Sequence, residues 1–297
     1  MSIHNRLVWY VLGAAVLGLV LPDVAALLHG LVPLMLAGQV VGIALTLPAR
    51  EFTRVVQRPW APVAALTIQW ICFPAAGLIL LHLTPDSTVG QGALIVAVAP
   101  AEITSALNAI VAKGSGALAV TCMAGSLALS TVLTPLWLAV ALGGSGQIDE
   151  RILVAELLLS VLLPLAAGVM VRTVWPAITR YSSWCLDLAA ISVLLVVFVG
   201  AGSARATLQG DRAIEAVIIC LILVLVGGAL GMMTGFLLRL QRADRTAVLF
   251  PIGMREFGVA TAVALVVAPR AVGIAGLYGI VIMASSAALA TRLACSS

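Results

Sequence analysis

The chain is a succession of apolar runs, most of them about as long as a bilayer is thick, joined by short polar links. A helix needs about 20 mainly apolar residues to cross the hydrocarbon core. Ten such runs lie between charged residues and Pro/Gly breaks, namely Leu7–Leu21, Val24–Leu47, Ala61–Leu83, Gly90–Ala112, Ala117–Leu142, Ile152–Val171, Leu186–Ser203, Ala213–Leu238, Thr246–Ala268 and Ala271–Ala290. The sequence therefore predicts an all-α membrane protein with ten transmembrane helices.

Composition favours the same class, because 62% of the 297 residues are hydrophobic and only 9% are charged. In a soluble domain about a quarter of the residues are charged. The longest polar links, Pro48–Trp60 and Gly143–Arg151, are too short to fold alone, and no G-x-x-x-x-G-K-[ST] loop occurs between them or elsewhere. The sequence therefore holds no nucleotide-driven pump domain, and its scattered arginines do not form a nucleic-acid surface.

The distribution of basic residues predicts an orientation. With the N-terminus in the cytoplasm, cytoplasmic links carry 11 of the 16 Lys and Arg residues and outside links carry 4. This bias follows the positive-inside rule, so both termini are expected on the cytoplasmic side. The membrane is expected to be a bacterial inner membrane or a plasma membrane. The N-terminal run is interpreted as the first span and not as a signal peptide, since similar runs follow it to the C-terminus.

The ten runs divide into two halves, residues 1–142 and 152–297, with five spans in each. An odd number of spans per half turns the second half upside down relative to the first. Each half has a proline inside its fourth span, Pro100 and Pro251, followed closely by charged residues. Interrupted spans at matching positions of inverted repeats are typical of the binding sites of carriers.

Three charges lie within spans: Glu102, Arg255 and Glu256. A charge in mid-bilayer costs about 2.5–3.5 kcal/mol and normally faces a partner in the protein interior. If the broken spans cross, Glu102 is expected to meet Arg255 or Glu256. Two interpretations are compatible and stay open: a structural ion pair between Glu102 and Arg255, or a solute or ion site at the crossing.

Further polar residues lie in or beside the same spans. Thr104, Ser105 and Asn108 follow Glu102, and Gln69 lies in the middle of the third span. No Cys or His set has metal-ligand spacing, and no nucleophile with a matching base is found, so neither a metal site nor an enzyme is predicted.

Several short motifs then occur in an order and spacing similar to those of the bile acid:sodium symporter family, which the chain resembles over nearly its whole length. The motifs are Val41–Pro48 with Glu51 and Phe52, Gln69 with Phe73 and Pro74, Ala99 and Pro100 with Ser105, Ala112–Gly114 with Ala117 and Leu118, Leu133–Leu136, Leu163 and Pro164 with Gly168 and Val171, and Gly253–Gly258.

The resemblance implies a panel domain made of spans 1, 2, 6 and 7 and a core domain made of spans 3–5 and 8–10, with spans 4 and 9 unwound where they cross. It also implies transport of a small organic anion by alternating access, usually driven by sodium. In such a site Gln69 and Ser105 would supply side chains, and Ile252 and Met254 would supply backbone carbonyls.

The departures from the family pattern are as informative as the matches. Pro251 stands where the family has a sodium-binding Glu, Ala106 replaces an Asn, and Arg255 replaces a Gln, while two hydroxyl positions fall on Ala119 and Met123. Because Arg does not deprotonate in proteins, we hypothesise that Arg255 occupies a former sodium position.

The coupling ion is consequently open. The carrier would be independent of sodium or coupled to protons through Glu102 or Glu256, and Arg255 could also bind a substrate carboxylate. In a third version Glu102 supplies the lost carboxylate and one altered sodium site persists. No other cofactor is expected, and the partners are the organic anion and the lipid bilayer.

Two other classes remain as alternatives. One is a carrier like the arsenite permeases, although their fourth-span Cys is missing here. The other is a membrane protein that keeps the fold without transporting anything, which the loss of sodium ligands favours.

Overall fold

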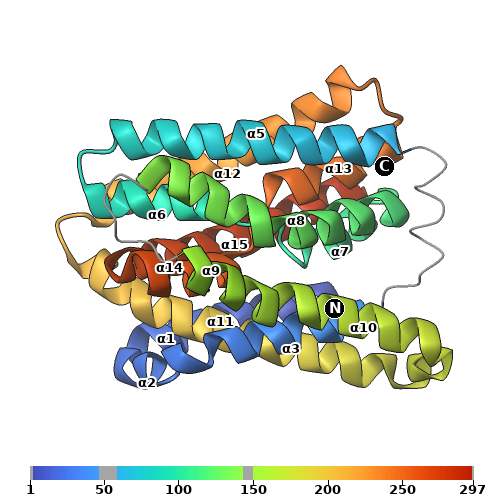
Figure 1. Cartoon of the computed structure of the whole chain (residues 1–297), viewed down its shortest axis with the longest axis horizontal. Helices are drawn as coiled ribbons and strands as arrows, with labels where there is room; N and C mark the ends of the chain where they lie inside the picture. Colours follow the sequence, from blue (N-terminus) through green and yellow to red (C-terminus); the bar gives the residue numbers. More distant parts are fainter. Residues whose placement is uncertain (1–2, 47–58, 143–149, 296–297) are drawn as a thin grey trace.

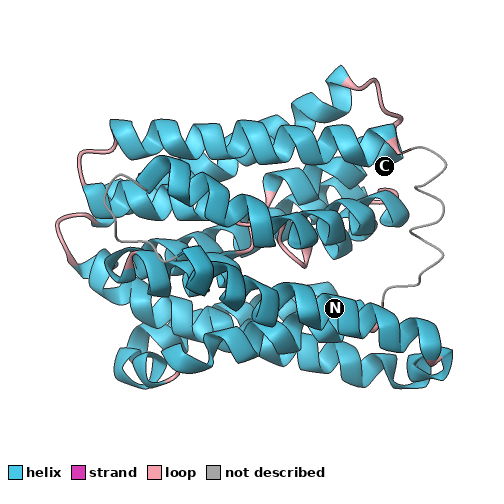
Figure 2. Cartoon of the chain, viewed as in Figure 1, coloured by secondary structure: helices cyan, strands magenta, loops and turns pink. Residues whose placement is uncertain are grey.

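The computed structural model describes residues 3–46, 59–142 and 150–295, and this part of the chain is helical except for short turns (Figures 1 and 2). The α-helices are α1 (Ile3–Val20), α2 (Pro22–Leu27), α3 (Val32–Ala44), α5 (Trp60–Leu83), α6 (Ser87–Ala97), α7 (Ser105–Val111), α8 (Gly116–Leu142), α9 (Glu150–Leu157), α10 (Leu163–Val174), α11 (Ser182–Gln209), α12 (Ala213–Leu237), α13 (Arg242–Gly253), α14 (Phe257–Val267) and α15 (Val272–Cys295). Short turns of 3₁₀-helix are η1 (His29–Leu31), η4 (Pro176–Tyr181) and η5 (Pro269–Ala271), and η3 (Leu158–Leu162) is a π-helical turn between α9 and α10.

The two longest predicted links fall mostly on residues 47–58 and 143–149, which lie outside the described residues. The same holds for Leu47, which ends the second predicted span, and for the motif residues Pro48, Glu51 and Phe52.

Within the described part of the chain, six helices are long and apolar enough to cross a membrane: Trp60–Leu83, Gly116–Leu142, Arg151–Val174, Ser183–Gln209, Ala213–Leu237 and Pro269–Cys295. Four further apolar helices are shorter: Trp9–Val20, His29–Ala44, Ser87–Ala97 and Phe257–Val267. The chain is therefore an integral membrane protein that crosses the bilayer several times, and ten crossings remain a prediction.

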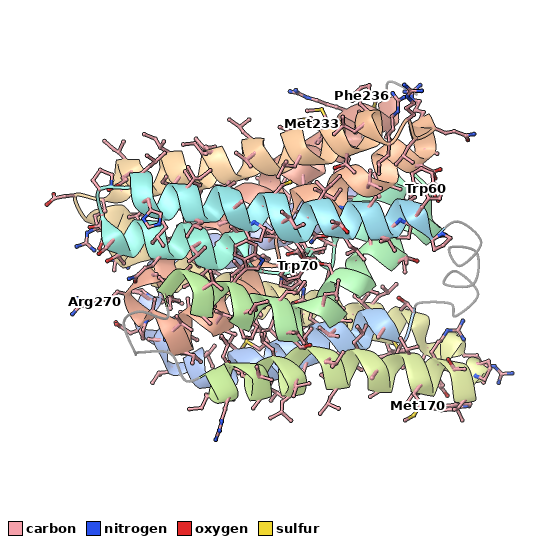
Figure 3. The ribbon with its side chains drawn as sticks, turned by 45° about the horizontal axis from the view of Figure 1, so that its top comes forward. Trp60, Trp70, Met170, Met233, Phe236 and Arg270 are labelled. Atoms are coloured by element: carbon pink, nitrogen blue, oxygen red, sulfur yellow. The ribbon has the colours of Figure 1, made fainter. Side chains whose placement is uncertain are left out.

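Large apolar side chains cover the outside of the bundle. Met170, Met233 and Phe236 project outward in Figure 3 and are 54–63% exposed, whereas Trp70 lies inside and is 4% exposed. An apolar exterior of this kind is stable only in contact with lipid or another protein.

The helices pack in two groups (Figure 1). On one side α1 and α3 pack against α11, and α3 also contacts α10; on the other side α12 packs against α13, and α5 against α6. Helix α15 lies between the groups and contacts α11 closely. Gly200 on α11 and Gly276 on α15 make this approach possible, because a Cβ on Gly276 would overlap the backbone of Gly200.

The fourth and ninth predicted runs are each two helices instead of one. Gly90–Ala112 contains most of α6 and all of α7, and Thr246–Ala268 contains most of α13 and all of α14. In Figure 1, α6 and α14 occupy the left half of the bundle and α7 and α13 the right half. The two chain breaks therefore meet near its middle.

Candidate solute and ion site at the crossing

The backbones of the two breaks are hydrogen-bonded to each other. Ala101 and Arg255 form an antiparallel β-bridge. Its hydrogen bonds run from the N–H of Glu102 to the carbonyl of Met254, 3.1 Å, and from the N–H of Glu256 to the carbonyl of Pro100, 2.9 Å. Buried backbone groups need a partner, so the bridge compensates for the helical bonds that both segments have lost.

The two prolines have different positions relative to the breaks. Pro100 lies in the first break itself, and the carbonyl of Val98 accepts a hydrogen bond from the Thr134 hydroxyl at 2.7 Å. Pro251 lies inside α13, and the second break begins three residues later at Met254. A proline has no N–H and disturbs the preceding turn. The two prolines therefore predicted both breaks correctly, but in the second half the break lies about one turn after the proline.

Side chains of an extended segment alternate between two faces. Ala101 and Arg255 are paired in the bridge, so they share one face, and Glu102 and Glu256 share the other. Arg255 forms an ion pair with neither glutamate. The Glu102–Arg255 ion pair considered from the sequence is therefore not formed, and Glu102 meets Glu256 instead.

The Arg255 side chain is fully buried on the side of α5. Its guanidinium carbon lies 4.3 Å from the centre of the Phe73 ring, a cation–π contact. Nη1 donates to the carbonyl of Ala99 at 3.3 Å, and Nη2 donates to the carbonyl of Ile252. Arg255 thus binds carbonyl oxygens from the first break and from the last turn of α13, as a bound cation would.

Gln69 on α5 completes the surroundings of the guanidinium. In the orientation that suits both amide atoms, its oxygen lies 2.8 Å from Nη1 of Arg255 and 2.7 Å from the Ser126 hydroxyl. The Ser126 oxygen in turn accepts the N–H of Ala101 at 2.8 Å. Pro74 leaves the Trp70 carbonyl of α5 without a helical donor, and the indole N–H of Trp137 donates to it at 3.0 Å.

The two glutamates on the opposite face are fully buried and lie next to each other. Glu256 caps α14, with one oxygen 3.2 Å from the N–H of Gly258 and the other 3.0 Å from the N–H of Ile103. Glu102 receives only longer contacts from Thr104, 3.4 Å from its N–H and 3.3 Å from its hydroxyl. The other oxygen of Glu102 has no hydrogen-bond partner within the described residues.

The remaining predicted residues surround the bridge. Asn108 on α7 donates to the sulfur of Met254 at 3.5 Å, so it joins the two breaks. The Thr104 hydroxyl lies 3.8 Å from the sulfur of Met283 on α15. The hydroxyl of Ser105 is fully buried and has no partner in the described part of the chain.

Four residues of the site were not predicted: Gln39, Phe73, Ser126 and Tyr278. Gln39 on α3 is fully buried beside Glu256, and neither of its amide atoms forms a complete hydrogen bond among the described residues. The Tyr278 hydroxyl on α15 accepts the N–H of Arg255 at 3.1 Å. Gln39 could have been found by the rule that identified Gln69, an isolated amide in an apolar run, whereas Phe73 and Tyr278 become neighbours of the site only through the fold.

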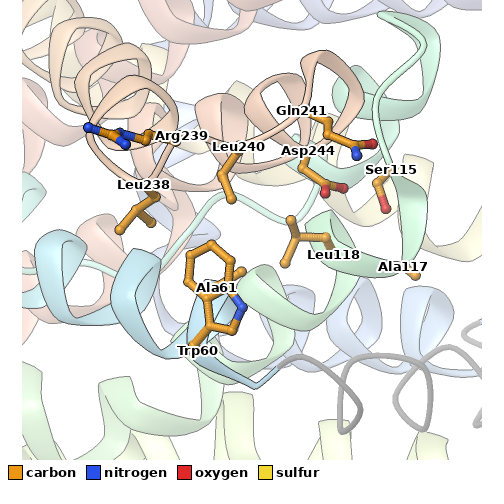
Figure 4. A pocket seen from close by; sticks show the side chains of 10 residues that line it. All are labelled: Trp60, Ala61, Ser115, Ala117, Leu118, Leu238, Arg239, Leu240, Gln241 and Asp244. Carbon is orange, nitrogen blue, oxygen red and sulfur yellow. The ribbon is translucent and has the colours of Figure 1, made fainter.

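The crossing itself is closed in this conformation, since Glu102, Arg255 and Glu256 are all 0% exposed. A cavity of about 370 Å³ lies at one end of the bundle, between the start of α5 and the turns α7–α8 and α12–α13 (Figure 4). Trp60, Leu240 and Asp244 are among its lining residues. A smaller cavity of about 60 Å³ lies between α12, α13 and α15 and reaches Gly253 and Met254.

The sequence has relatives among known proteins. Residues 33–211 match the family model described as Sodium Bile acid symporter family. A Bacillus subtilis (strain 168) protein, "Uncharacterized sodium-dependent transporter YocS", is 27% identical over 260 residues, which are 86% of this chain and 80% of that protein. A rice protein (Oryza sativa subsp. japonica), "Probable sodium/metabolite cotransporter BASS2, chloroplastic", is 26% identical over 175 residues, 58% of this chain and 42% of that protein.

Proposed function

The chain belongs to the sodium bile acid symporter family, a family of membrane transporters, and from this premise we propose that it is a secondary carrier of a small organic anion. The observation that carries the proposal is the pairing of two unwound segments in the middle of the bundle, with buried ionisable groups on both faces of the pair. Discontinuous helices that meet in this way form the solute and ion sites of many carriers.

The proposed transport cycle moves two domains against each other. Helices α1, α3, α9, α10 and α11 would form the panel, and α5–α8 and α12–α15 the core. Helices α1 and α3 pack against α11, and α10 packs against α3, which supports this division. The opposite directions from which α6 and α13 approach the crossing in Figure 1 support inverted repeats, 1–142 and 152–297.

We further propose that Arg255 acts as a resident cation in place of a sodium ion. Its guanidinium binds the carbonyls of Ala99 and Ile252 and the amide oxygen of Gln69. Sodium needs several hard oxygen ligands of this kind, and Arg255 has already taken them. The names of both relatives include sodium, so an arginine that replaces the sodium ion would distinguish this chain from them.

The test is uptake into proteoliposomes. Ligands are first screened by thermal shift with small mono- and dicarboxylates, because a ligand that binds the folded form raises its melting temperature. Uptake of the best ligand is then measured with and without a sodium gradient, and equal rates are expected. Strict, steep dependence on sodium would rule out Arg255 as the resident cation. Absence of binding and uptake for every anion would rule out the carrier function.

We propose that the protein lies in a bacterial inner membrane or a plasma membrane, with both termini on the cytoplasmic side. Lys113 and Arg239 support this, since the α7–α8 and α12–α13 turns that contain them adjoin at one end of the bundle, where the Ser115 N–H donates to the Ala243 carbonyl at 3.0 Å.

A further inference from the structure

Glu102 and Glu256 form a carboxyl pair without a cation. Both are fully buried and adjacent, and no ion pair reaches either of them within the part of the chain that the structure describes. Two carboxylates at one buried site repel each other, so such pairs favour sharing a proton. Arg255 does not relieve the repulsion directly, because it points to the opposite face of the β-bridge.

The hydrogen bonds distinguish the two members of the pair. Glu256 accepts two backbone N–H groups, at 3.0 and 3.2 Å, and caps the positive end of α14, which suits an ionised carboxylate. Glu102 has contacts of only 3.3–3.4 Å on one oxygen and none on the other. A proton on the free oxygen of Glu102 would give it a donor for Glu256, which the ionised pair lacks.

Charge balance leads to the same state. One proton on the pair leaves a single negative charge, and Arg255 carries a single positive charge. The buried crossing is then neutral, as an apolar environment requires. A sodium ion could also balance two ionised glutamates, but four backbone oxygens at the crossing already accept hydrogen bonds. Pro100 and Met254 carbonyls accept bridge N–H groups, and those of Ala99 and Ile252 accept Arg255.

The pair lies at the boundary between the two helix groups. The start of α14 packs against Leu36 of α3 and Val196 of α11. Gln39 of α3 reaches Glu256 from that side with both amide atoms free of complete hydrogen bonds. This buried amide therefore lies directly beside the carboxyl pair, where the two groups of helices meet.

We propose that the Glu102–Glu256 pair binds the proton that is transported together with the organic anion. The proposal rests on the carrier function proposed above. In the outward state water delivers a proton to the free oxygen of Glu102, which removes one negative charge from the site. The anion then binds beside the pair, and after the domains move both anion and proton are released. An anion that binds better to the protonated site makes the proton bind better in turn.

Among the residues that the structure describes, other titratable groups near the pair are few. Tyr278 of α15 and Arg255 are the two next to it, and α9, which contacts α14, carries the partly buried Glu156. Glu156 thus offers a matched control, a membrane-embedded carboxyl outside the pair.

The first test needs no substrate. Infrared spectra of the purified protein in sodium-free buffer near neutral pH are expected to contain the C=O band of a protonated carboxyl. Glu102→Gln should remove this band, Glu256→Gln should shift it, and Glu156→Gln should leave it unchanged. A band that survives both pair substitutions would show that the pair shares no proton and would overturn the proposal. A band that disappears when sodium chloride replaces choline chloride would show that the pair binds sodium instead of a proton.

The second test measures coupling with the anion found in the uptake screen. In sodium-free proteoliposomes an imposed pH gradient should drive accumulation, up to about tenfold per pH unit for one proton and one monoanion. Glu102→Gln should lose this accumulation, and any anion exchange that remains should no longer depend on pH, which a merely structural role would not produce. Glu156→Gln, outside the pair, should accumulate the anion as the wild type does. Wild-type uptake that ignores the pH gradient would contradict proton coupling. A shared proton without uptake of any anion would contradict the carrier function instead.

Discussion

Arg255 is a buried cation in a membrane protein, and it is stabilised without a carboxylate. The carbonyl oxygens of Ala99 and Ile252, the Gln69 amide and the Phe73 ring share its charge. Hydrogen bonds to a charged group are about twice as strong as neutral ones, so three oxygen acceptors and one aromatic face can replace an ion pair. The arrangement also fixes where the guanidinium points, which a single ion pair would not do.

Replacing Arg255 by Ala is expected to lower the free energy of unfolding by about 3 kcal/mol, because two buried carbonyls lose this donor and the Gln69 amide oxygen loses one of its donors. Arg255→Lys should recover only part of the loss, since an ammonium lacks the planar fork. The measurement is thermal unfolding in detergent. Arg270→Ala, at an exposed position on η5, is the control and should have little effect. Equal melting temperatures for Arg255→Ala and the control would contradict the role given to these contacts.

At this scale the sequence predicted which residues are unusual and left open whether Glu102 meets Arg255 or Glu256. Glu102, Arg255 and Glu256 stand out as charges within apolar runs. The β-bridge then decides that Arg255 faces away from both glutamates. A bridge register depends on how two distant segments meet, and no local pattern encodes it. Gln39 lies in an apolar run as Gln69 does, so the sequence carried the same signal for both, but only the fold places Gln39 beside Glu256.

At the scale of elements, glycines determine how closely two helices approach. Gly200 on α11 and Gly276 on α15 bring the two helix groups into backbone contact. Most single-helix predictions matched the structure to within a few residues, for example Ala61–Leu83 against α5 (Trp60–Leu83). The second and sixth runs were less regular than predicted, because η1 precedes α3 and a π-helical turn separates α9 from α10.

Gly276→Ala is expected to destabilise the protein by about 1–3 kcal/mol, because the added methyl group would overlap the backbone of Gly200 and force the helices apart. Gly228→Ala on α12 is the matched control, since nothing lies within 4 Å of a Cβ at that position. It should be neutral or slightly stabilising. Thermal unfolding of both variants under one condition measures the difference, and similar melting temperatures would show that α11 and α15 do not depend on this contact.

The start of α6 provides a prediction on pH. Asp86 caps this helix by accepting the N–H groups of Thr88 and Val89, and it forms an ion pair with Arg212 at 2.6 Å. Slight burial raises the pKa of Asp86, but the two N–H groups and the Arg212 charge outweigh it and hold the pKa below its usual range. Its contribution to stability is therefore present above the unfolded-state pKa and is lost as the pH falls through the folded-state value.

Asp86→Ala should consequently lower the free energy of unfolding by about 1 kcal/mol at neutral pH, and the difference from wild type should shrink in acid. Asp86→Asn should cost less than Asp86→Ala, because the amide oxygen can still cap the helix. Melting temperatures measured at about pH 7 and about pH 3 test this. A difference that stays constant with pH would show that the charge of Asp86 contributes nothing.

At the scale of the whole molecule, the apolar exterior and the family membership agree on a multi-pass membrane transporter. The sequence predicted the apolar exterior and the family. Both predictions rest on the whole chain, so errors in the bounds of single helices do not affect them. Orientation in the membrane rests on the basic residues alone, since the fold itself has no preferred direction relative to the cytoplasm.

Labelling of single cysteines tests the orientation. In a background that lacks the five native cysteines, Asp211→Cys, in the turn between α11 and α12, should react with a membrane-impermeant maleimide on intact cells. Gln241→Cys, before α13, should react only after the cells are opened. Both positions are exposed, so access and not burial decides the result. The reverse pattern would invert the proposed topology.

The bridge between residues 101 and 255 is made by main-chain atoms alone. Every amino acid except proline offers the same N–H and carbonyl groups, so the join can persist while the side chains around it change. Selection can therefore exchange a metal-ion ligand for an arginine, or an amide for a carboxyl, without redesigning the scaffold. A change of driving ion or cargo then requires changes in the side chains around the join and not in the join itself.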